Sequence, residues 1–190
     1  MQLTELKQRL EGHVAPEAES PPSRRSAVAM LMRPGEQGPE VLLMVRAEHP
    51  DDPWSGQVGL PGGRREDFDA DLRATAQRET EEEVGVALGD VAEFLCRLES
   101  IQARARGRKI EMDVTPFAYW TTETIETTLN YEVAEVFWLP LERAASGELD
   151  GEYPYEKDGT RYRLPCWKFE GRTIWGLTFR MLSGLLGLTR

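Results

Sequence analysis

The sequence is short of the residues that build disulfide frameworks, zinc sites and membrane spans. Its two cysteines, Cys96 and Cys166, are too few and too far apart for a disulfide framework or a zinc site. Its two histidines, His13 and His49, also lack the spacing of metal ligands. No apolar run approaches transmembrane length, and residues 1–12 predict an amphipathic helix instead of a signal peptide. These absences predict a protein of the cytoplasm that does not bind membranes.

Basic residues are also in the minority, with 23 Lys and Arg against 33 Asp and Glu and a formal net charge of −10. Binding to a phosphate backbone requires a basic face, so this balance argues against nucleic acid as a partner. The 190 residues are enough for one sizeable core and short for two. We therefore expect a single domain over residues 1–190, in which residues 1–23 form an N-terminal helix and a proline-bearing linker.

Acidic residues, in contrast, are concentrated in one informative segment, GGRREDFDADLRATAQRETEEEVGV, over residues 62–86. Glu79, Glu82 and Glu83 are spaced i, i+3 and i+4, so they are neighbours on one side of a helix. Asp69 or Asp71 can cap the start of this helix, because aspartate is a favoured N-cap residue. Residues that recur every fourth position predict the buried stripe of the same helix: Leu72, Ala76, Thr80 and Val84.

Three neighbouring carboxylates repel one another, so we interpret the triplet as a binding site for a cation. Oxygen ligands without histidine or cysteine select a hard ion, Mg²⁺ or Mn²⁺. The alternative is an ordinary solvated helix face. The glycine turn before the helix and the buried stripe beside the carboxylates favour the cation site, and Arg78 is positioned to support the carboxylates by pairing with them.

The segment combines a glycine loop, an RE-x-x-EE core and a closing Gly-apolar pair, at Gly63, Arg78-Glu79, Glu82-Glu83 and Gly85-Val86. In this combination it resembles the Nudix box, the signature of the Nudix hydrolases. The loop is one residue longer than in the common form, and the position of the family's early glutamate falls on Ala70. We therefore expect no early acidic ligand.

The resemblance implies an α/β protein with the Nudix-type α/β/α sandwich around a mixed β-sheet, and it suggests a homodimer. It also implies that metal-activated water cleaves the pyrophosphate of a nucleoside diphosphate linked to another moiety, with Glu79, Glu82 and Glu83 as the metal ligands. The order of patterns fits this fold. We expect strands near residues 26–32, 41–47, 91–101, 112–120 and 134–140, a short helix near 141–147, a pair of short strands around 162–171 and a last helix near Trp175.

Residues ahead of the box are similar to the upstream motif of Nudix enzymes that cleave coenzyme A. The matching residues are Leu42, Leu43, Arg46, Ala47, Gly56 and Leu60-Pro61-Gly62-Gly63. Leu60 stands where that motif usually has an aromatic residue, and an arginine expected between the two halves is replaced by a stretch with Asp51 and Asp52. The C-terminal run beginning at Trp175, WGLT, is also similar to that subfamily. The resemblance implies hydrolysis of coenzyme A to 3′,5′-ADP and 4′-phosphopantetheine.

Candidate substrate contacts come from glycines and arginines. Gly62 and Gly63 form the turn, and Arg46, at a strand end, can contact a phosphate or pair with a neighbouring acid. Arg106 and Arg108 belong to a basic stretch that also includes Arg104 and Lys109. If a strand continued through this stretch, its arginines would share one side and could receive a phosphate; the alternative is a solvated loop tip.

Glu132 is the candidate general base, because it lies in a loop-like stretch before a predicted strand, where several Nudix enzymes carry a further acidic residue. Glu132 is preferred to Glu135, which begins the predicted strand. If Glu132 is not the base, Glu79 or Glu82 takes that role. The predicted catalytic set is therefore Arg78, Glu79, Glu82 and Glu132. Two alternative functions are a pyrophosphatase for ADP-ribose, NADH or a dinucleotide polyphosphate, and a non-catalytic Nudix-like domain that senses a nucleotide.

Overall fold

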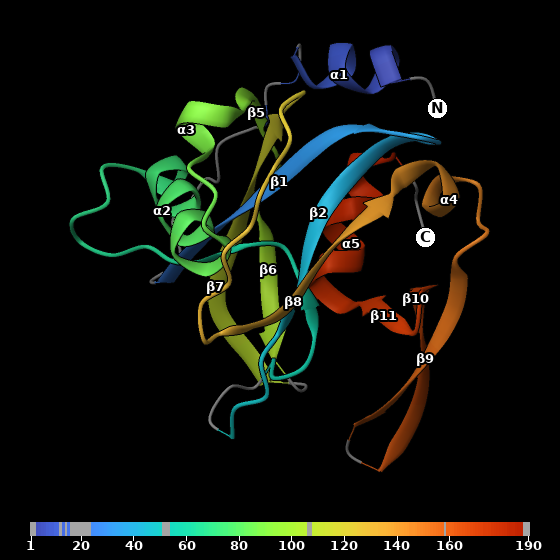
Figure 1. Cartoon of the computed structure of the whole chain (residues 1–190). Coiled ribbons are helices and arrows are strands. Elements are labelled where there is room, and N and C mark those ends of the chain that lie inside the picture. Colours follow the sequence, from blue (N-terminus) through green and yellow to red (C-terminus); the bar gives the residue numbers. More distant parts are fainter. Residues whose placement is uncertain are drawn as a thin grey trace.

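The structure is a computed structural model that describes residues 3–11, 13, 15, 24–50, 54–105, 108–157 and 159–187. Its main sheet is mixed, because β1 and β7 pair in parallel while the other pairings are antiparallel (Figure 1). The strands of this sheet are β1 (Arg24–Gly35), β2 (Gly38–Arg46), β3 (Val58–Gly59), β4 (Gly62–Arg64), β5 (Glu93–Arg97), β6 (Ile101–Ala105), β7 (Arg108–Trp120) and β8 (Val133–Pro140).

Helices cover both faces of this sheet, so the predicted α/β fold with a mixed sheet between helices is confirmed (Figure 1). Strand β1 shows why both faces are covered, since its alternate residues enter two different hydrophobic clusters. Met30 and Met32 enter the cluster beneath α5, whereas Ala29 and Leu31 enter the cluster beneath α2. The helices are α1 (Leu3–Glu11), α2 (Leu72–Val84), α3 (Leu88–Val91), α4 (Leu141–Ala145) and α5 (Gly176–Leu185).

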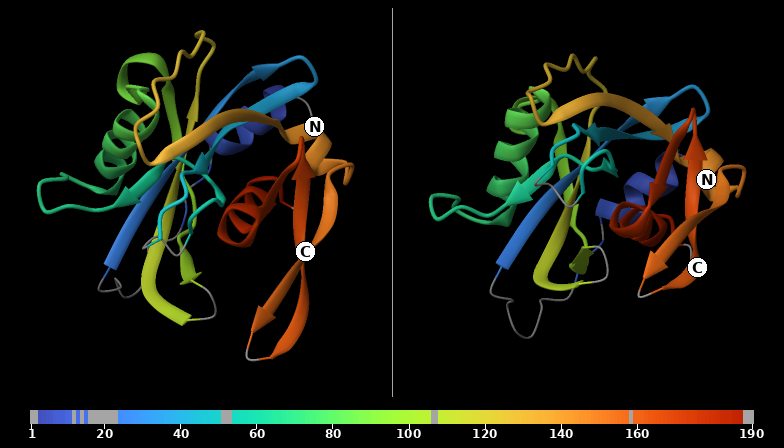
Figure 2. Two further views of the ribbon diagram at one scale, coloured as in Figure 1. Left: turned by 60° about the horizontal axis from the view of Figure 1, so that its bottom comes forward. Right: turned by 90° about the horizontal axis from the view of Figure 1, so that it is seen from below.

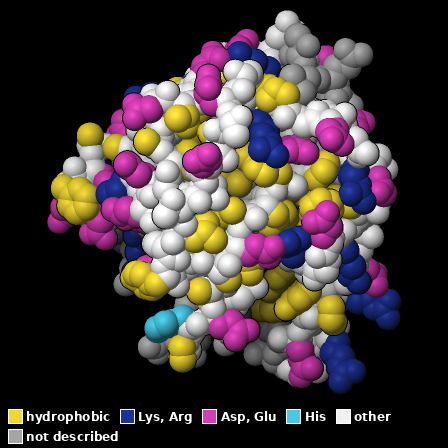
Figure 3. All heavy atoms as spheres, viewed as in Figure 1, with side chains coloured by type: hydrophobic (Ala, Val, Ile, Leu, Met, Phe, Trp, Pro, Cys, Tyr) yellow, Lys and Arg dark blue, Asp and Glu magenta, His cyan; other side chains and the backbone are white. Residues whose placement is uncertain are grey.

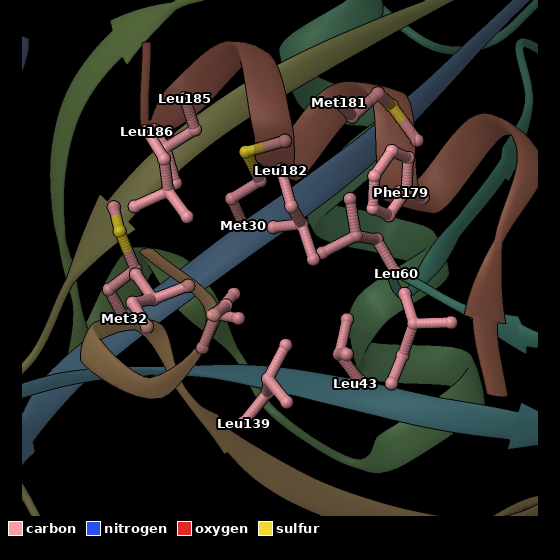
Figure 4. Packing of buried hydrophobic residues seen from close by; sticks show 14 of the residues in the cluster. Met30, Met32, Leu43, Leu60, Leu139, Phe179, Met181, Leu182, Leu185 and Leu186 are labelled. Carbon is pink, nitrogen blue, oxygen red and sulfur yellow. The ribbon is translucent and has the colours of Figure 1, made fainter. Parts of the chain in front are cut away.

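The C-terminal helix α5 closes the larger of the two hydrophobic clusters. Figure 4 shows Leu182 and Leu185 of α5 on the same side of the sheet as Met30, Met32 and Leu43, and all five are buried. The apolar C-terminal run therefore completes the core. The predicted N-terminal helix α1 also joins this cluster through buried side chains, and the guanidinium of Arg9 donates to the carbonyl of Leu185.

A second sheet lies beside α5, on the side away from α2 (Figure 2). Its strands are β9 (Asp150–Lys157), β10 (Thr160–Phe169) and β11 (Arg172–Trp175), and both pairings are antiparallel. The sequence predicted only a pair of short strands here, because the run that forms β9 contains Pro154 and several charges. Among the described residues, no helix is both long and apolar enough to cross a membrane.

Candidate active site at the carboxylate helix

The glycine turn brings the carboxylate helix α2 against strand β1. Gly62 has φ +148°, and a Cβ there would overlap the carbonyl oxygen of Ala27. A Cβ on Gly63 would overlap the carboxyl group of Glu79. Position 62 therefore requires glycine, whereas a side chain at position 63 would displace the Glu79 carboxyl group. The backbone of both residues lies directly beside the helix that carries the glutamates. The helix starts at the N-cap Asp71, whose carboxylate accepts from the N–H of Ala74 at 2.8 Å.

Glu83 is the most deeply buried of the glutamates, with 2% of the residue exposed. Its Oε2 accepts a hydrogen bond from the Gly62 N–H at 2.8 Å, and its Oε1 lies 3.8 Å from Nη1 of Arg46. Burial raises the pKa of Glu83 to about 8, and the negative charges of Glu79 and Glu132 add to this effect, although the Gly62 hydrogen bond and Arg46 oppose it. The protein therefore does not supply enough positive charge to balance this carboxylate.

Glu79 and Glu82 lie beside Glu83, with Arg78 between their carboxylates. Burial also raises the pKa of Glu79, and the charges of Glu82 and Glu132 act in the same direction, while Arg78 lowers it. Nη1 of Arg78 is 3.0 Å from Oε1 of Glu79 and 3.0 Å from Oε2 of Glu82. Glu82 is the most accessible of the triplet, because 55% of its side chain is exposed.

Glu132 occupies a turn before β8, as the sequence predicted. The loop that carries it is tied to the end of α2, because the N–H of Asn130 donates to the carbonyl of Glu83 at 3.1 Å. The backbone carbonyl of Glu132 accepts a hydrogen bond at 2.8 Å from the N–H of Ala47, the residue after Arg46. Since the charge of Glu132 acts on both Glu79 and Glu83, the structure brings a fourth carboxylate to the triplet.

Asp69 holds Arg78 in place, a role that the sequence did not predict. The guanidinium makes a two-point ion pair with this aspartate, with Nε to Oδ1 at 2.9 Å and Nη2 to Oδ2 at 3.0 Å. The Asp69 side chain is 3% exposed, and its pairing with Arg78 holds the pKa of that carboxyl well below its usual range. Asp69 was predicted only as a possible cap, since a partner nine residues away matches no helical spacing.

The donor set of this site fits a hard divalent ion. Four carboxylates lie close enough here to influence one another, without histidine or cysteine, and burial raises the pKa values of two of them. Within the ranges that the structure describes, no three acidic, histidine or cysteine groups already converge on one metal-binding point. The carboxylates of this structure instead contact Arg78, Arg46 and the Gly62 N–H.

The remaining predicted contacts lie apart from one another. Arg46, the last residue of β2, pairs with Glu83, which is the acidic-neighbour alternative. Arg106 lies outside the described residues. Arg108 begins β7 after β6 has ended at Ala105, so no single strand continues through the basic stretch, and the condition for placing its arginines on one strand side is not met. The chain turns back here because β6 pairs with β7 in a hairpin, with Ala105 opposite Arg108.

A pocket of about 600 Å³ lies on the α5 side of the sheet, at the end of β2 that carries Arg46. Its wall includes Tyr153 and Tyr155 of β9, Trp175 of β11, and Gly56 and Gln57 from the segment before the glycine turn. Figure 3 shows hydrophobic side chains in a recess on this face, next to acidic and basic ones. The two tyrosines carry no sequence signal, because only the pairing of β9 with β10 brings them to this place.

Comparison with known proteins gives a consistent set of matches. Residues 22–158 match the family model for the NUDIX domain. The chain is 32% identical over 166 residues to the Yersinia pestis (strain Pestoides F) protein described as "Uncharacterized Nudix hydrolase NudL", covering 86% of this chain and 78% of that protein. Two solved structures have similar folds. A NUDIX hydrolase from Alicyclobacillus acidocaldarius has a TM-score of 0.54 at 20% identity, covering 86% of this chain and 91% of that one. A C. elegans Ap4A hydrolase has a TM-score of 0.53 at 22% identity, covering 65% and 84%.

Proposed function

The chain belongs to the Nudix hydrolase family. From the resemblance of its segments around Gly56–Gly63 and Trp175 to coenzyme A-cleaving enzymes, we propose that its substrate is coenzyme A or a coenzyme A derivative. Membership itself makes the protein a hydrolase that acts on pyrophosphate bonds of nucleoside diphosphate derivatives. The proposed products are 3′,5′-ADP and 4′-phosphopantetheine. The reaction adds water across the bond between one phosphorus atom and the bridging oxygen, and no covalent enzyme intermediate is required.

One observation supports the substrate proposal above all. The two segments that resemble coenzyme A-cleaving enzymes, around Gly56–Gly63 and from Trp175, are more than a hundred residues apart in sequence but adjacent in space. Thr178 donates a hydrogen bond to the carbonyl of Val58 at 3.0 Å, and Trp175 and Gly56 line the same pocket. Two separate parts of one resemblance therefore form one continuous surface, which is the arrangement expected of a substrate site.

We propose that Glu79, Glu82 and Glu83 hold Mg²⁺ or Mn²⁺. When bound, the ion supplies positive charge for the pyrophosphate and lowers the pKa of a coordinated water. The raised pKa values of Glu79 and Glu83, which burial causes, support this assignment, because a divalent cation would stabilise the charged form of both carboxylates.

The remaining catalytic roles fall to residues that position charges or move a proton. Arg78, held by Asp69, orients Glu79 and Glu82, and the Gly62 N–H orients Glu83. Glu132 accepts the proton of the attacking water, a role supported by its position beside the triplet and by its surface location in a turn. Gly62 and Gly63, whose backbone lies beside Glu83 and Glu79, are proposed to border the bound substrate.

Three arginines are proposed to contact phosphates of the substrate. Arg46 stands next to Glu83 and is proposed to contact the pyrophosphate. Arg106 and Arg108 are proposed to receive the 3′-phosphate of coenzyme A, a group that dephospho-coenzyme A lacks. We further propose that the protein forms a homodimer and acts in the cytoplasm. Light scattering coupled to gel filtration tests the oligomeric state.

A substrate panel tests the proposal directly. The purified chain is incubated with coenzyme A, dephospho-coenzyme A, ADP-ribose, NADH and diadenosine polyphosphates, with Mg²⁺, with Mn²⁺ or with chelator, and products are identified by mass spectrometry. We expect 3′,5′-ADP from coenzyme A with either metal and none with chelator. Preferential cleavage of ADP-ribose or a diadenosine polyphosphate would replace the substrate assignment. Equal KM values for coenzyme A and dephospho-coenzyme A would remove the role of Arg106 and Arg108.

A further inference from the structure

The pocket on the α5 side of the sheet has an aromatic wall. Tyr153 and Trp175 stack with ring centroids 4.0 Å apart and ring planes at 17°, and Tyr155 lies 6.0 Å from Trp175 at 43°. All three line the pocket and none is fully buried. Rings that support one another in this way form a rigid surface on which a planar ligand can stack at little entropic cost.

The one arginine in the pocket lining is already neutralised. Nε of Arg172 donates to Glu135 at 3.1 Å, Nη1 lies 3.2 Å from Glu170, and the guanidinium lies 4.5 Å from the ring centroid of Phe137. With two carboxylates around one guanidinium, this wall has no excess of positive charge to attract a phosphate. The polar lining, which includes Gln57 and Glu135, instead offers hydrogen-bond partners to an uncharged ring with nitrogen donors and acceptors.

The pocket and the carboxylates are connected through two short segments of the chain. Val45 lines the pocket, and the next residue of β2, Arg46, pairs with Glu83 on the other face of the sheet. The segment after β2 makes the same connection, because Val58 lines the pocket and Gly62, four residues later, donates to Glu83. The aromatic wall and the glutamates therefore lie on opposite faces of the sheet, at the same end of β2.

We propose that this pocket binds the nucleobase of the substrate, stacked on the aromatic wall of Tyr153, Tyr155 and Trp175. The proposal rests on the proposed function in one respect, since it assumes that the substrate carries a base. It assigns the two halves of a nucleoside diphosphate derivative to opposite faces of the sheet, at the end of β2. The base lies on the α5 side, and the pyrophosphate lies by Glu83.

Calorimetric titration of the full chain in Mg²⁺ with the two products separates the halves of the substrate, because neither product contains a pyrophosphate and neither is cleaved. Tyr155→Ala and Trp175→Ala are each expected to raise the Kd for 3′,5′-ADP about tenfold, since stacking of a base on an aromatic side chain is worth this much or more. The Kd for 4′-phosphopantetheine is expected to stay unchanged. Tyr162→Ala is the matched control, because this exposed tyrosine of β10 neighbours Tyr155 but does not line the pocket.

Several results would overturn the assignment. Unchanged affinity for 3′,5′-ADP in both variants, or no binding of it by the parent chain, excludes a base site in this pocket. A loss confined to 4′-phosphopantetheine would give the pocket to the other half of the molecule. Because Trp175 precedes α5, Trp175→Phe and thermal melts control for misfolding. Titration with AMP separates this inference from the substrate proposal. If the pocket binds the base, the variants should bind AMP more weakly than the parent chain, even if coenzyme A is not cleaved.

Discussion

At the end of β2, the pKa values of acidic side chains are shifted in opposite directions on the two faces of the sheet. On the α2 side, burial raises the pKa of Glu83 to about 8 and also raises that of Glu79. On the α5 side, pairing with Arg172 lowers the pKa of Glu135, which is exposed and opposite Val45 in the sheet. The α2 side contains more negative charge than its arginines balance, whereas on the α5 side Arg172 balances Glu135.

This difference teaches what each region can bind. Buried carboxylates whose pKa values are raised are stabilised by a cation from outside, so the α2 side suits a metal ion and the phosphates that follow it. An ion pair at a pocket wall leaves no net charge to be neutralised, so the α5 side suits an uncharged ring. Changes to the two regions should therefore have separable effects on chemistry, stability and binding.

Removal of the Glu83 charge is expected to have the largest effect. Glu83→Gln keeps the acceptor for the Gly62 N–H but loses a proposed metal ligand, so kcat should fall about 1,000-fold, equivalent to about 4 kcal/mol of transition-state stabilisation. Steady-state kinetics with product detection measure this. Tyr162→Ala should retain parent activity. A fall of less than tenfold in the Glu83 variant would mean that the carboxylate helix is not the catalytic region.

Loss of Arg78 is expected to affect stability as well as rate. Arg78→Ala leaves the buried carboxylate of Asp69 without its partner, which should lower the free energy of unfolding by about 3 kcal/mol. The loss of orientation at Glu79 and Glu82 should lower kcat 10- to 100-fold. Denaturant unfolding and kinetics measure the two effects. If Arg78→Ala and Asp69→Asn both leave stability unchanged, the pair does not hold the site together.

Glu132→Gln is expected to lower kcat about 100-fold with little change in stability, because Glu132 lies in a turn and is proposed to move a proton. A pH–rate profile adds a second reading, since loss of a general base should also remove the acidic limb of the profile. Tyr162→Ala, which lies outside the pocket lining, serves as the comparison. Near-normal turnover of the Glu132 variant would transfer the role of base to Glu79 or Glu82.

A smaller effect is expected on the stability of the metal-free protein. The pKa of Glu83 is higher folded than unfolded, so folding takes up a proton between pH 4.5 and 8, and the carboxylate costs stability increasingly as pH rises through this window. In chelator, Glu83→Gln should therefore be about 2 kcal/mol more stable than the parent at pH 8.5 and equal to it near pH 4. Thermal or urea unfolding across this pH range measures the difference.

In the same unfolding experiment, Glu135→Gln is expected to change stability in the opposite direction to Glu83→Gln. Because pairing with Arg172 lowers the pKa of Glu135, its contribution to stability is present above pH 4.5 and is lost as pH falls through the folded-state pKa. The Glu135 variant should thus be slightly less stable than the parent at neutral pH and approach it in acid. The same sign for both variants would contradict the contrast between the two regions.

Local patterns predicted much of the fold and the helix that carries the three glutamates. The helix over Leu72–Val84, its glycine turn and the strands on either side follow from spacings within a few residues, which sequence periodicity records. The ion pair of Asp69 with Arg78 was missed, because nine residues and a turn separate the partners. Whether a strand continues through the basic stretch was left open by the sequence, because the hairpin pairing of β6 with β7 decides where β6 ends.

The sequence by itself determined the reaction class of this protein, since three glutamates at helical spacing behind a glycine turn form a local motif. Only the tertiary structure decided which carboxylate is buried, what balances its charge and where an aromatic wall stands. Burial of Glu83 depends on α2 packing on β1, and the wall of Tyr155 and Trp175 depends on three strands that pair far from the motif. Electrostatic balance and pocket shape arise from such long-range contacts, and no local spacing specifies them.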